Sequence, residues 1–436
     1  MYKMYLLNLS VSGIKNIEKE VSLSFYKKTL AEHLDSDKYR VKAIYGENGA
    51  GKSAIVTAVY LFKNLVLKRN YLAESSNQSK LAELINKKTG TFRYSCEFHV
   101  EGEGKSCVFK YGVVLKKDEL GLFYIAKETL EQRRRINDDG SYETVYAIEE
   151  GELIELCCDK ESSSLVARKT ANLMKQSTLP ALEFNTHVGM SEVLPATSQV
   201  IILALITTVH MENEDYHDAY LLWDKFLEDS QGLMSAEERD KLVSQLRMAS
   251  GTDKALIHKD KLDQYIRDVG QLAEFVRIFK PDLREILVEK KINADIYECS
   301  LVLDYGSYQV SAEFESTGIK KLMRLYNSFE LAAITTITFI DELDANLNDV
   351  YLCRLIEFFV NYGKGQLCFT THNIGPMSIL KNNKNSIDFL SSDNLLTSWT
   401  KNGNYTPDSL YKKGYIEHIP FNVEAIDFLR VFGGKQ

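Results

Sequence analysis

The chain has 436 residues, of which 44% are hydrophobic and 26% are charged. These values are close to those of ordinary globular proteins, so they exclude a largely disordered chain and predict a sizeable core. Acidic residues outnumber Lys and Arg by 61 to 53, which gives a formal net charge of −8. The chain as a whole is therefore not attracted to nucleic acid or to an anionic membrane, although a local basic patch remains compatible with this balance.

We expect a cytoplasmic protein without a membrane partner. The longest apolar stretch, residues 200–209, is about half as long as the roughly 20 residues that a membrane-spanning helix needs. The first residues, MYKMYLLNLSVSG, lack the cleavage site of a signal peptide and predict a strand. The seven cysteines show no CxxC spacing and most have apolar neighbours, which indicates reduced, buried thiols rather than a zinc site.

In chain order, the amino-terminal part predicts strands and one amphipathic helix. Residues 4–25 predict a strand, a turn and a second strand, and residues 39–45 predict a third strand that leads into a glycine-rich loop. Residues 54–68 place apolar side chains on one face of a helix. Residues 94–100 and 108–115 alternate polar with apolar side chains around a glycine-containing turn, so they predict an antiparallel hairpin.

The second half begins with a charged, glycine-poor region, residues 210–290, that is long enough for about three or four helices. Residues 297–303 and 308–314 then predict two strands joined by a short turn. Towards the carboxyl end, helix and strand patterns alternate, which predicts a parallel sheet.

The strongest signal for a function is the run GENGAGKS at residues 46–53, between a predicted strand and a predicted helix. It has the spacing G-x-x-x-x-G-K-[ST], in which backbone N–H groups of a glycine-rich turn surround phosphate oxygens. Lys52 would reach the β- and γ-phosphates of ATP, and the Ser53 hydroxyl would hold Mg²⁺. The residues that we expect to contact the nucleotide or its ion are Asn48, Gly49, Gly51, Lys52 and Ser53.

A second candidate element is ITFIDE at residues 337–342, an apolar run that ends in two carboxylates. This pattern predicts a buried parallel strand that presents Asp341 at its carboxyl edge, where Mg²⁺ or its waters can be held. The adjacent Glu342 would point elsewhere and polarise an attacking water as a general base. Two solvated acids at a strand end would look the same, and the pairing with Lys52 favours the catalytic interpretation.

Two shorter segments complete the set. Ser316 can cap the helix that follows it, and Gly318, which has no side chain, leaves the N-terminus of that helix open to an anion. On their own, these two residues favour an ordinary N-cap. His372 follows the apolar residues 367–369, where a lone histidine is usually structural. One helix and one strand fit between Ser316 and Asp341, and another pair fits before His372, so order and spacing favour a functional role for both.

Taken together, these motifs resemble the ABC-type ATPase heads of the SMC, RecF and OLD kind. Within that group the chain most resembles stand-alone ATPases of bacterial abortive-infection and anti-phage systems. The resemblance implies an α/β, ABC-ATPase-like P-loop fold with a mixed parallel core sheet, an antiparallel β subdomain and a helical insertion. It places the two lobes of the head at residues 1–209 and 293–436, with the insertion at 210–292. The matching segments are, in order, GIKNI, GENGAGKS, ESTG, ITFIDE, LDANL and TTHN.

The resemblance also implies that ATP is sandwiched between subunits of a homodimer or a higher homo-oligomer. One subunit would supply the glycine-rich loop and the two carboxylates, and the other would supply Ser316 and Gly318. Asp344 would lie at the subunit boundary, and His372 would contact the γ-phosphate side. The glutamine that such heads use is left open between Gln176 and Gln199.

The implied function is a cytoplasmic ATPase that acts as a sensor, regulator or scaffold in anti-phage defence. The segment after His372 is expected to be too short for the nuclease domain that OLD-type proteins append, so a nuclease or toxin effector would be a separate protein. The alternative is a RecF- or SMC-like ATPase of DNA repair or recombination. Its DNA contacts would be the arginines at 133–135 or the lysines at 290–291, which also suit solvated loops. The ESTG motif departs from LSGGQ, which makes a transporter subunit the least favoured interpretation.

Overall fold

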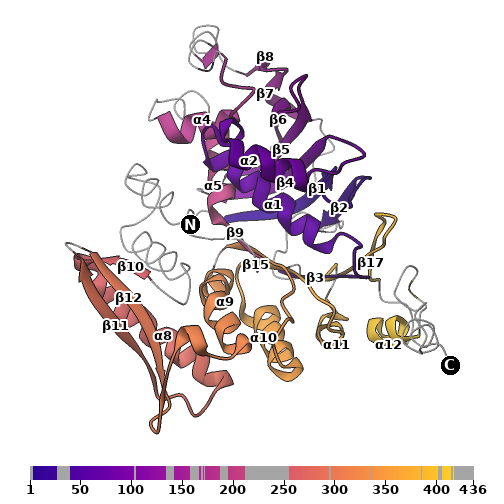
Figure 1. The fold of residues 1–436 in the computed structure, drawn as a ribbon. Coiled ribbons are helices and arrows are strands. Elements are labelled where there is room, and N and C mark those ends of the chain that lie inside the picture. Colours follow the sequence, from indigo (N-terminus) through magenta and orange to yellow (C-terminus); the bar gives the residue numbers. More distant parts are fainter. Residues whose placement is uncertain are drawn as a thin grey trace, which may run out of the picture. The chain divides into compact units, whose positions relative to one another are not determined.

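The protein is a mixed α/β structure with parallel and antiparallel strand pairs (Figure 1). A computed structural model describes residues 3–26, 40–102, 105–133, 142–157, 166–167, 170, 172–186, 195–211, 255–293, 296–334, 336–383, 385–400, 405–413 and 416. Two compact units divide the chain, one made of Met1–Ala204 with Cys368–Gln436 and the other of Leu205–Leu367. This division differs from the predicted segments, because residues 205–209 and 293–367 belong to the same unit.

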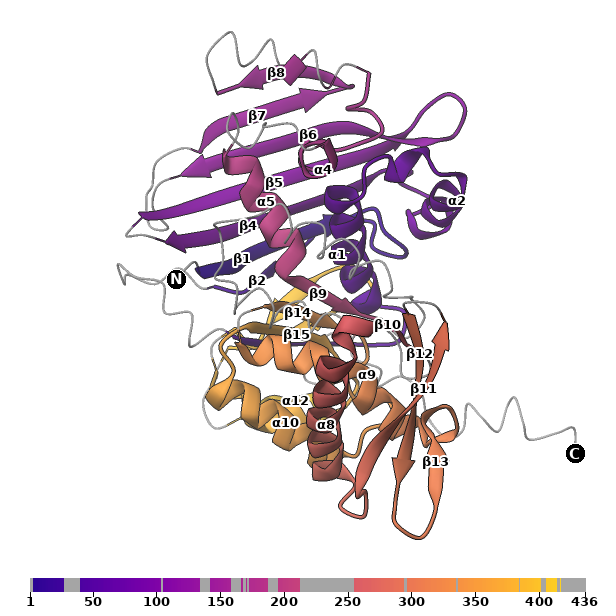
Figure 2. The same ribbon diagram turned by 90° about the vertical axis from the view of Figure 1, so that its left-hand side faces the viewer.

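An antiparallel sheet of seven strands dominates the first unit (Figure 2). In β4 (Phe92–Gly102) every second side chain from Phe92 to Val100 is buried, as the alternating sequence predicts, and the predicted hairpin of β4 with β5 (Lys105–Lys117) is confirmed. The predicted first pair, β1 (Lys3–Ser12) with β2 (Val21–Ser24), is confirmed as well. In spatial order the strands are β2 (Val21–Ser24), β1 (Lys3–Ser12), β4 (Phe92–Gly102), β5 (Lys105–Lys117), β6 (Phe123–Arg133), β7 (Glu143–Glu149) and β8 (Glu152–Leu156).

Helices cover one face of this sheet. The predicted amphipathic helix is α1 (Lys52–Leu67), and its Phe62 ring stacks on Tyr94 of β4 with the ring centroids 4.7 Å apart. Figure 2 shows α5 (Pro195–Ile206) running across the same strands. The described part of the first unit also contains α2 (Ser75–Leu84), α4 (Leu179–Thr186), α11 (Gly375–Leu380) and α12 (Pro407–Lys412).

A buried carboxyl group lies between this sheet and α4. Glu128 of β6 accepts hydrogen bonds from the hydroxyls of Tyr111 and Tyr146, at 3.0 and 2.8 Å, and from the Leu179 N–H at 3.0 Å. The side chain is fully buried, and this burial raises the pKa of Glu128 to about 7.

The glycine-rich loop follows a second group of strands in the first unit. The fully buried β3 (Val41–Gly46) pairs in parallel with β16 (Ile387–Leu390), which pairs in the antiparallel sense with β17 (Leu396–Ser398). Lys42 of β3 forms an ion pair with Asp388 of β16 at 2.7 Å. The predicted third strand and the predicted parallel pairing are thus confirmed.

The second unit also contains a parallel pair, β9 (Thr207–His210) with β14 (Ile337–Ile340). Beside it are α9 (Thr317–Ile334) and α10 (Asp349–Tyr362). An antiparallel sheet consists of β10 (Ala255–His258), β12 (Ile296–Asp304), β11 (Glu285–Asn293) and β13 (Gln309–Ser311). Figure 1 shows α8 (Leu262–Phe279) alongside this sheet, and Val269, Leu272 and Val276 of α8 share one core with Leu301 and Leu303 of β12.

The prediction of a purely helical region at 210–292 is wrong for its described part. Residues 255–293 contain α8, but they also contain the strands β10 and β11. In β11 the inward Ile286 and Val288 alternate with the exposed Glu285 and Glu289. The two-residue period of a strand is therefore present, but the many charged residues around it make the segment look like a solvated helix. The predicted strand at 308–314 ends at Ser311, because Ala312–Phe314 form a 3₁₀ turn. The helices predicted between 212 and 254 lie outside the described residues.

Within the described ranges, no helix is both long and apolar enough to cross a membrane. The cysteines that the structure describes are all free, and Cys96, Cys299 and Cys368 are buried.

Candidate active site

The glycine-rich loop joins the carboxyl end of β3 to the first turn of α1. Gly49 and Gly51 have positive φ angles, +82° and +109°, which favour glycine. A Cβ atom at Gly51 would lie 2.8 Å from Ile17 Cγ1, and one at Gly46 would lie 2.3 Å from the Leu390 carbonyl oxygen. Side chains are therefore excluded at two points of the loop by close neighbours.

Lys52 is folded over this loop. Its side chain is buried, and Nζ donates hydrogen bonds to the carbonyl oxygens of Gly46 at 2.9 Å and Glu47 at 3.1 Å. No side chain caps α1 at Gly51, so backbone N–H groups of its first turn face the loop. Ser53, in the same turn, is partly exposed. A cation and an uncapped helix N-terminus at one loop form a suitable setting for phosphate.

Two more segments of the first unit support the loop. Asn16, in the turn after β1, donates a side-chain hydrogen bond to the Gly49 carbonyl oxygen. Asn394, after β16, holds that turn: its Oδ1 accepts from the Glu18 N–H at 2.8 Å, and its Nδ2 donates to the Asn16 carbonyl oxygen at 3.3 Å. Sequence reasoning missed both asparagines. The GIKNI segment was a signal for Asn16, but nothing marked Asn394.

The histidine segment lies beside β3 in the same unit. It follows β15 (Gln366–Thr370), and the Thr371 N–H donates to the Ile44 carbonyl oxygen at 3.2 Å. The Thr371 hydroxyl accepts from the Asn373 N–H at 2.9 Å, which fixes the turn that carries the exposed His372. The structure thus places His372 next to the strand that leads into the glycine-rich loop.

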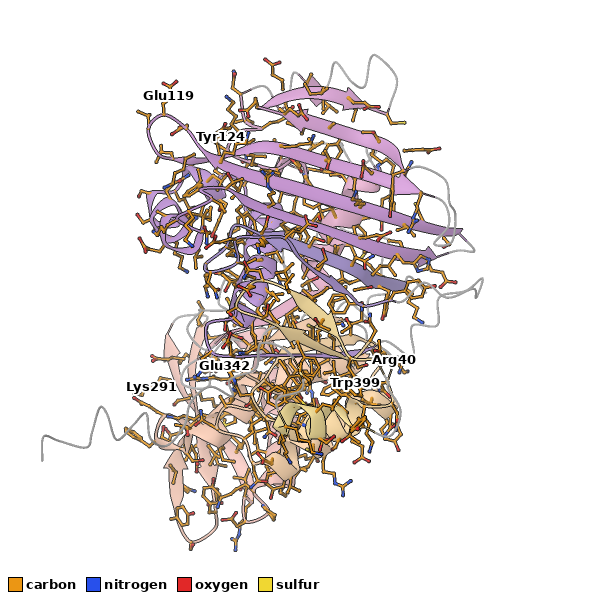
Figure 3. The ribbon with its side chains drawn as sticks, turned by 90° about the vertical axis from the view of Figure 1, so that its right-hand side faces the viewer. Arg40, Glu119, Tyr124, Lys291, Glu342 and Trp399 are labelled. Atoms are coloured by element: carbon orange, nitrogen blue, oxygen red, sulfur yellow. The ribbon has the colours of Figure 1, made fainter. Side chains whose placement is uncertain are left out.

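In the second unit, the two carboxylates follow the fully buried β14 as predicted. The Asp341 N–H donates to the His210 carbonyl oxygen of the parallel neighbour β9 at 2.8 Å, so the pairing continues to the end of the strand. Glu342 is exposed and has a φ angle of +49°, a conformation that is uncommon for a residue with a side chain (Figure 3). Its carbonyl oxygen accepts hydrogen bonds from the Ala345 N–H at 3.0 Å and from Lys321 Nζ at 2.5 Å.

The start of α9 lies against the segment that follows β14. The Ser316 hydroxyl accepts from the Ile319 N–H at 3.4 Å, so the N-cap prediction for Ser316 is confirmed. A Cβ atom at Gly318 would lie 2.7 Å from the carbonyl oxygen of Asn346, two residues after Asp344. The structure therefore brings Ser316 and Gly318 together with the segment that contains Glu342 and Asp344.

Two buried basic residues near these carboxylates were missed by sequence reasoning. Lys321 of α9 is 4% exposed and His210 of β9 is 6% exposed. Burial, together with the positive charges of Lys321 and Arg324, lowers the pKa of His210 to about 3, so its imidazole is neutral at physiological pH. No motif marks either residue, and Lys321 is surrounded in the sequence by the apolar stripe of an ordinary amphipathic helix.

One of the residues predicted as a DNA contact, Arg133, already has an acidic partner. Arg133 forms an ion pair with Glu97 at 2.6 Å, with both side chains largely buried, and its guanidinium lies 4.8 Å from the Tyr142 ring centroid. Its charge is thus already compensated within the sheet, while the next two arginines lie outside the described residues. Lys291 is exposed on β11, where it remains a candidate contact (Figure 3).

The predicted site residues therefore gather in two groups, each inside one unit. The first consists of the glycine-rich loop with His372, and the second of the two carboxylates and Asp344 with the start of α9. A scan against models of known protein families finds no match to this chain, and a search of curated proteins finds none either.

Proposed function

We propose that the protein is an ATPase that binds ATP at the loop between β3 and α1. One observation carries this proposal: Lys52 Nζ donates hydrogen bonds to the carbonyl oxygens of Gly46 and Glu47, beside the uncapped N-terminus of α1. A triphosphate supplies negative charge and acceptor oxygens to the Lys52 ammonium and to the backbone N–H groups of the helix N-terminus. Replacement of those two carbonyl contacts by phosphate oxygens would move Lys52 from its present hydrogen bonds to the ligand.

Hydrolysis would use the carboxylates after β14. Glu342 would accept a proton from water as the water oxygen forms a bond to the γ-phosphorus, while the bond from that phosphorus to the bridging oxygen of ADP breaks. The Ser53 hydroxyl and the Asp341 carboxylate are hard oxygen donors of the kind that suits Mg²⁺, and both are partly exposed. When bound, Mg²⁺ supplies positive charge to the phosphate oxygens.

The proposal extends to an ABC-ATPase-like P-loop fold and to a homodimer with ATP between the subunits. In that assembly Ser316 of the partner subunit and Gly318 of the partner subunit would face the nucleotide. The order of the motifs supports this, as does the exposure of Ser316 at the start of α9. By resemblance, the biological role would be control of a separate effector, a nuclease or a toxin, in anti-phage defence in the cytoplasm.

Binding of ATP by calorimetry and phosphate release test the enzymatic part. Lys52→Ala should weaken binding about 10- to 100-fold, because it removes a charged hydrogen-bond donor to phosphate. Glu342→Gln should bind ATP normally, and its rate of hydrolysis should fall by at least about 100-fold. Lys87→Ala, at an exposed position, is the matched control for the loss of a lysine. Wild-type binding by Lys52→Ala would refute the proposed site.

Light scattering tests the dimer. Glu342→Gln should gain mass with ATP and Mg²⁺ but not with ADP, because hydrolysis no longer separates the subunits. The same mass under all conditions would count against the sandwich. Phage plating tests the defence role in cells that carry this protein together with the neighbouring gene, which would encode the separate effector. Wild type should lower the number of plaques, and Lys52→Ala should not.

A further inference from the structure

The contact between α9 and the turn after β14 has a role that the motifs do not assign. Lys321 is almost completely buried, and its Nζ donates to the Glu342 carbonyl oxygen at 2.5 Å. Lysine is rarely this buried, because its ammonium loses water, and an apolar residue would fill the same space at lower cost. A buried ammonium that donates a hydrogen bond to the main chain of Glu342 indicates that the position of Glu342 matters.

The residue held in this way has an unusual backbone. Glu342 adopts φ +49°, which costs roughly 1–2 kcal/mol for a residue with a side chain. The hydrogen bonds from Lys321 and from the Ala345 N–H both end on its carbonyl oxygen, so they fix the peptide that follows Glu342. A fixed peptide also fixes the direction in which the Glu342 side chain leaves the backbone.

We propose that Lys321 is a positioning residue that holds the general base Glu342 in place and links it to the start of α9. The inference rests on the proposed function of Glu342. The same helix carries Ser316 and Gly318, and Gly318 leaves no room for a side chain against the Asn346 carbonyl oxygen. Binding of a phosphate at the start of α9 would therefore act on the turn that carries Glu342 of the same subunit. It would do so through the hydrogen bond from Lys321 to Glu342 and through the close approach of Gly318 to Asn346.

The test compares Lys321→Met with Lys320→Met in the full-length protein. Lys320 is the preceding residue of the same helix and donates to the Glu313 carbonyl oxygen at 3.2 Å, away from Glu342. We expect Lys321→Met to lower kcat about tenfold or more with the Kd for ATP changed less than about twofold, which is the signature of a lost transition-state interaction. Lys320→Met should stay within about twofold of wild type in both constants.

A double variant separates positioning from general stability. If Lys321 acts through Glu342, Lys321→Met should slow hydrolysis no further in a Glu342→Gln background, since coupled residues are not additive. Additive losses, or a weakening of ATP binding as large as the fall in kcat, would overturn the inference. Should Lys321→Met fail to fold, Lys321→Arg and Lys321→Gln replace it. Lys321→Arg keeps a long cationic donor and should therefore retain a higher kcat than Lys321→Gln, which has a shorter neutral amide. Equal kcat values for these two variants would overturn the inference.

Failure of the proposed function gives a different result. If wild-type protein hydrolyses no ATP, or if hydrolysis does not depend on Lys52 and Glu342, the proposed function fails and the inference fails with it. If hydrolysis depends on both residues but Lys321→Met keeps kcat within about twofold of wild type, only the positioning role is refuted.

Discussion

Loss of the Lys42 ammonium should destabilise the first unit far more than loss of a surface charge. The side chains of Lys42 and Asp388 are 2% and 0% exposed, and their Nζ and Oδ2 atoms are 2.7 Å apart. The second carboxylate oxygen of Asp388 accepts from the Ser398 hydroxyl at 2.6 Å, and Lys42 Nζ lies 5.7 Å from the Phe25 ring centroid. Lys42→Met keeps most of the side-chain volume and leaves the carboxylate of Asp388 buried without its ion-pair partner.

The expected magnitude follows from this geometry. At 2.7 Å and an effective dielectric constant of about 20, the Coulomb attraction is about 6 kcal/mol, most of which offsets the lost hydration of both groups. Breaking such a pair from one side costs about 3–5 kcal/mol, because the remaining charge is buried without compensation. For a unit of this size that corresponds to a fall in melting temperature of roughly 6–20 °C.

Thermal unfolding followed by circular dichroism measures the effect. Asp388→Asn combined with Lys42→Met should recover at least about half of the loss, because the amide is neutral and its oxygen still accepts from Ser398. Lys87→Met is the matched control, since Lys87 and Glu83 form an exposed pair that contributes less than about 1 kcal/mol. If Lys42→Met melts within about 3 °C of wild type, the reasoning on this ion pair is wrong.

Three further predictions concern other parts of the chain. Glu128→Gln should stabilise the protein at pH 8 by roughly 1–3 kcal/mol and change little at pH 5, because the folded carboxyl keeps its proton up to its pKa of about 7 whereas the unfolded one loses it near 4.5. The free energy of unfolding of the wild type should thus fall as the pH rises between these two pKa values. Urea unfolding at a series of pH values measures this, and the same dependence on pH for wild type and Glu128→Gln would contradict it. Gly51→Ala should abolish ATP binding in calorimetry, because its Cβ would lie 2.8 Å from a neighbouring side chain; Gly90→Ala, also at positive φ but with open space around it, should bind normally. Glu342→Gly should be more stable than Glu342→Ala by roughly 1 kcal/mol, whereas at Glu274 within α8 the order should reverse in the same thermal melts.

Much of the fold could be predicted because its patterns are local. The hairpin of β4 and β5 follows from strict alternation, and the loop before α1 follows from glycine and lysine spacing. β11 could not be predicted, because its outward residues are charged and a short strand period looks like a solvated helix. Asn16 and Lys321 could not be assigned to the site, because each reaches a main-chain oxygen that is distant along the chain.

The turn after β14 combines two features that lower stability, a strained backbone and a buried lysine. Both Glu342 and Asn346 have positive φ angles, +49° and +59°, within six residues of the strand end at Ile340. α9 meets this turn twice, with a buried lysine at one carbonyl oxygen and with a glycine against another. A turn selected for stability alone would place glycine at position 342 and an apolar residue at position 321. Strain of this kind persists where the surrounding structure enforces it, and strained residues are enriched at functional sites. The backbone of this turn therefore supports our proposal that Glu342 is the general base.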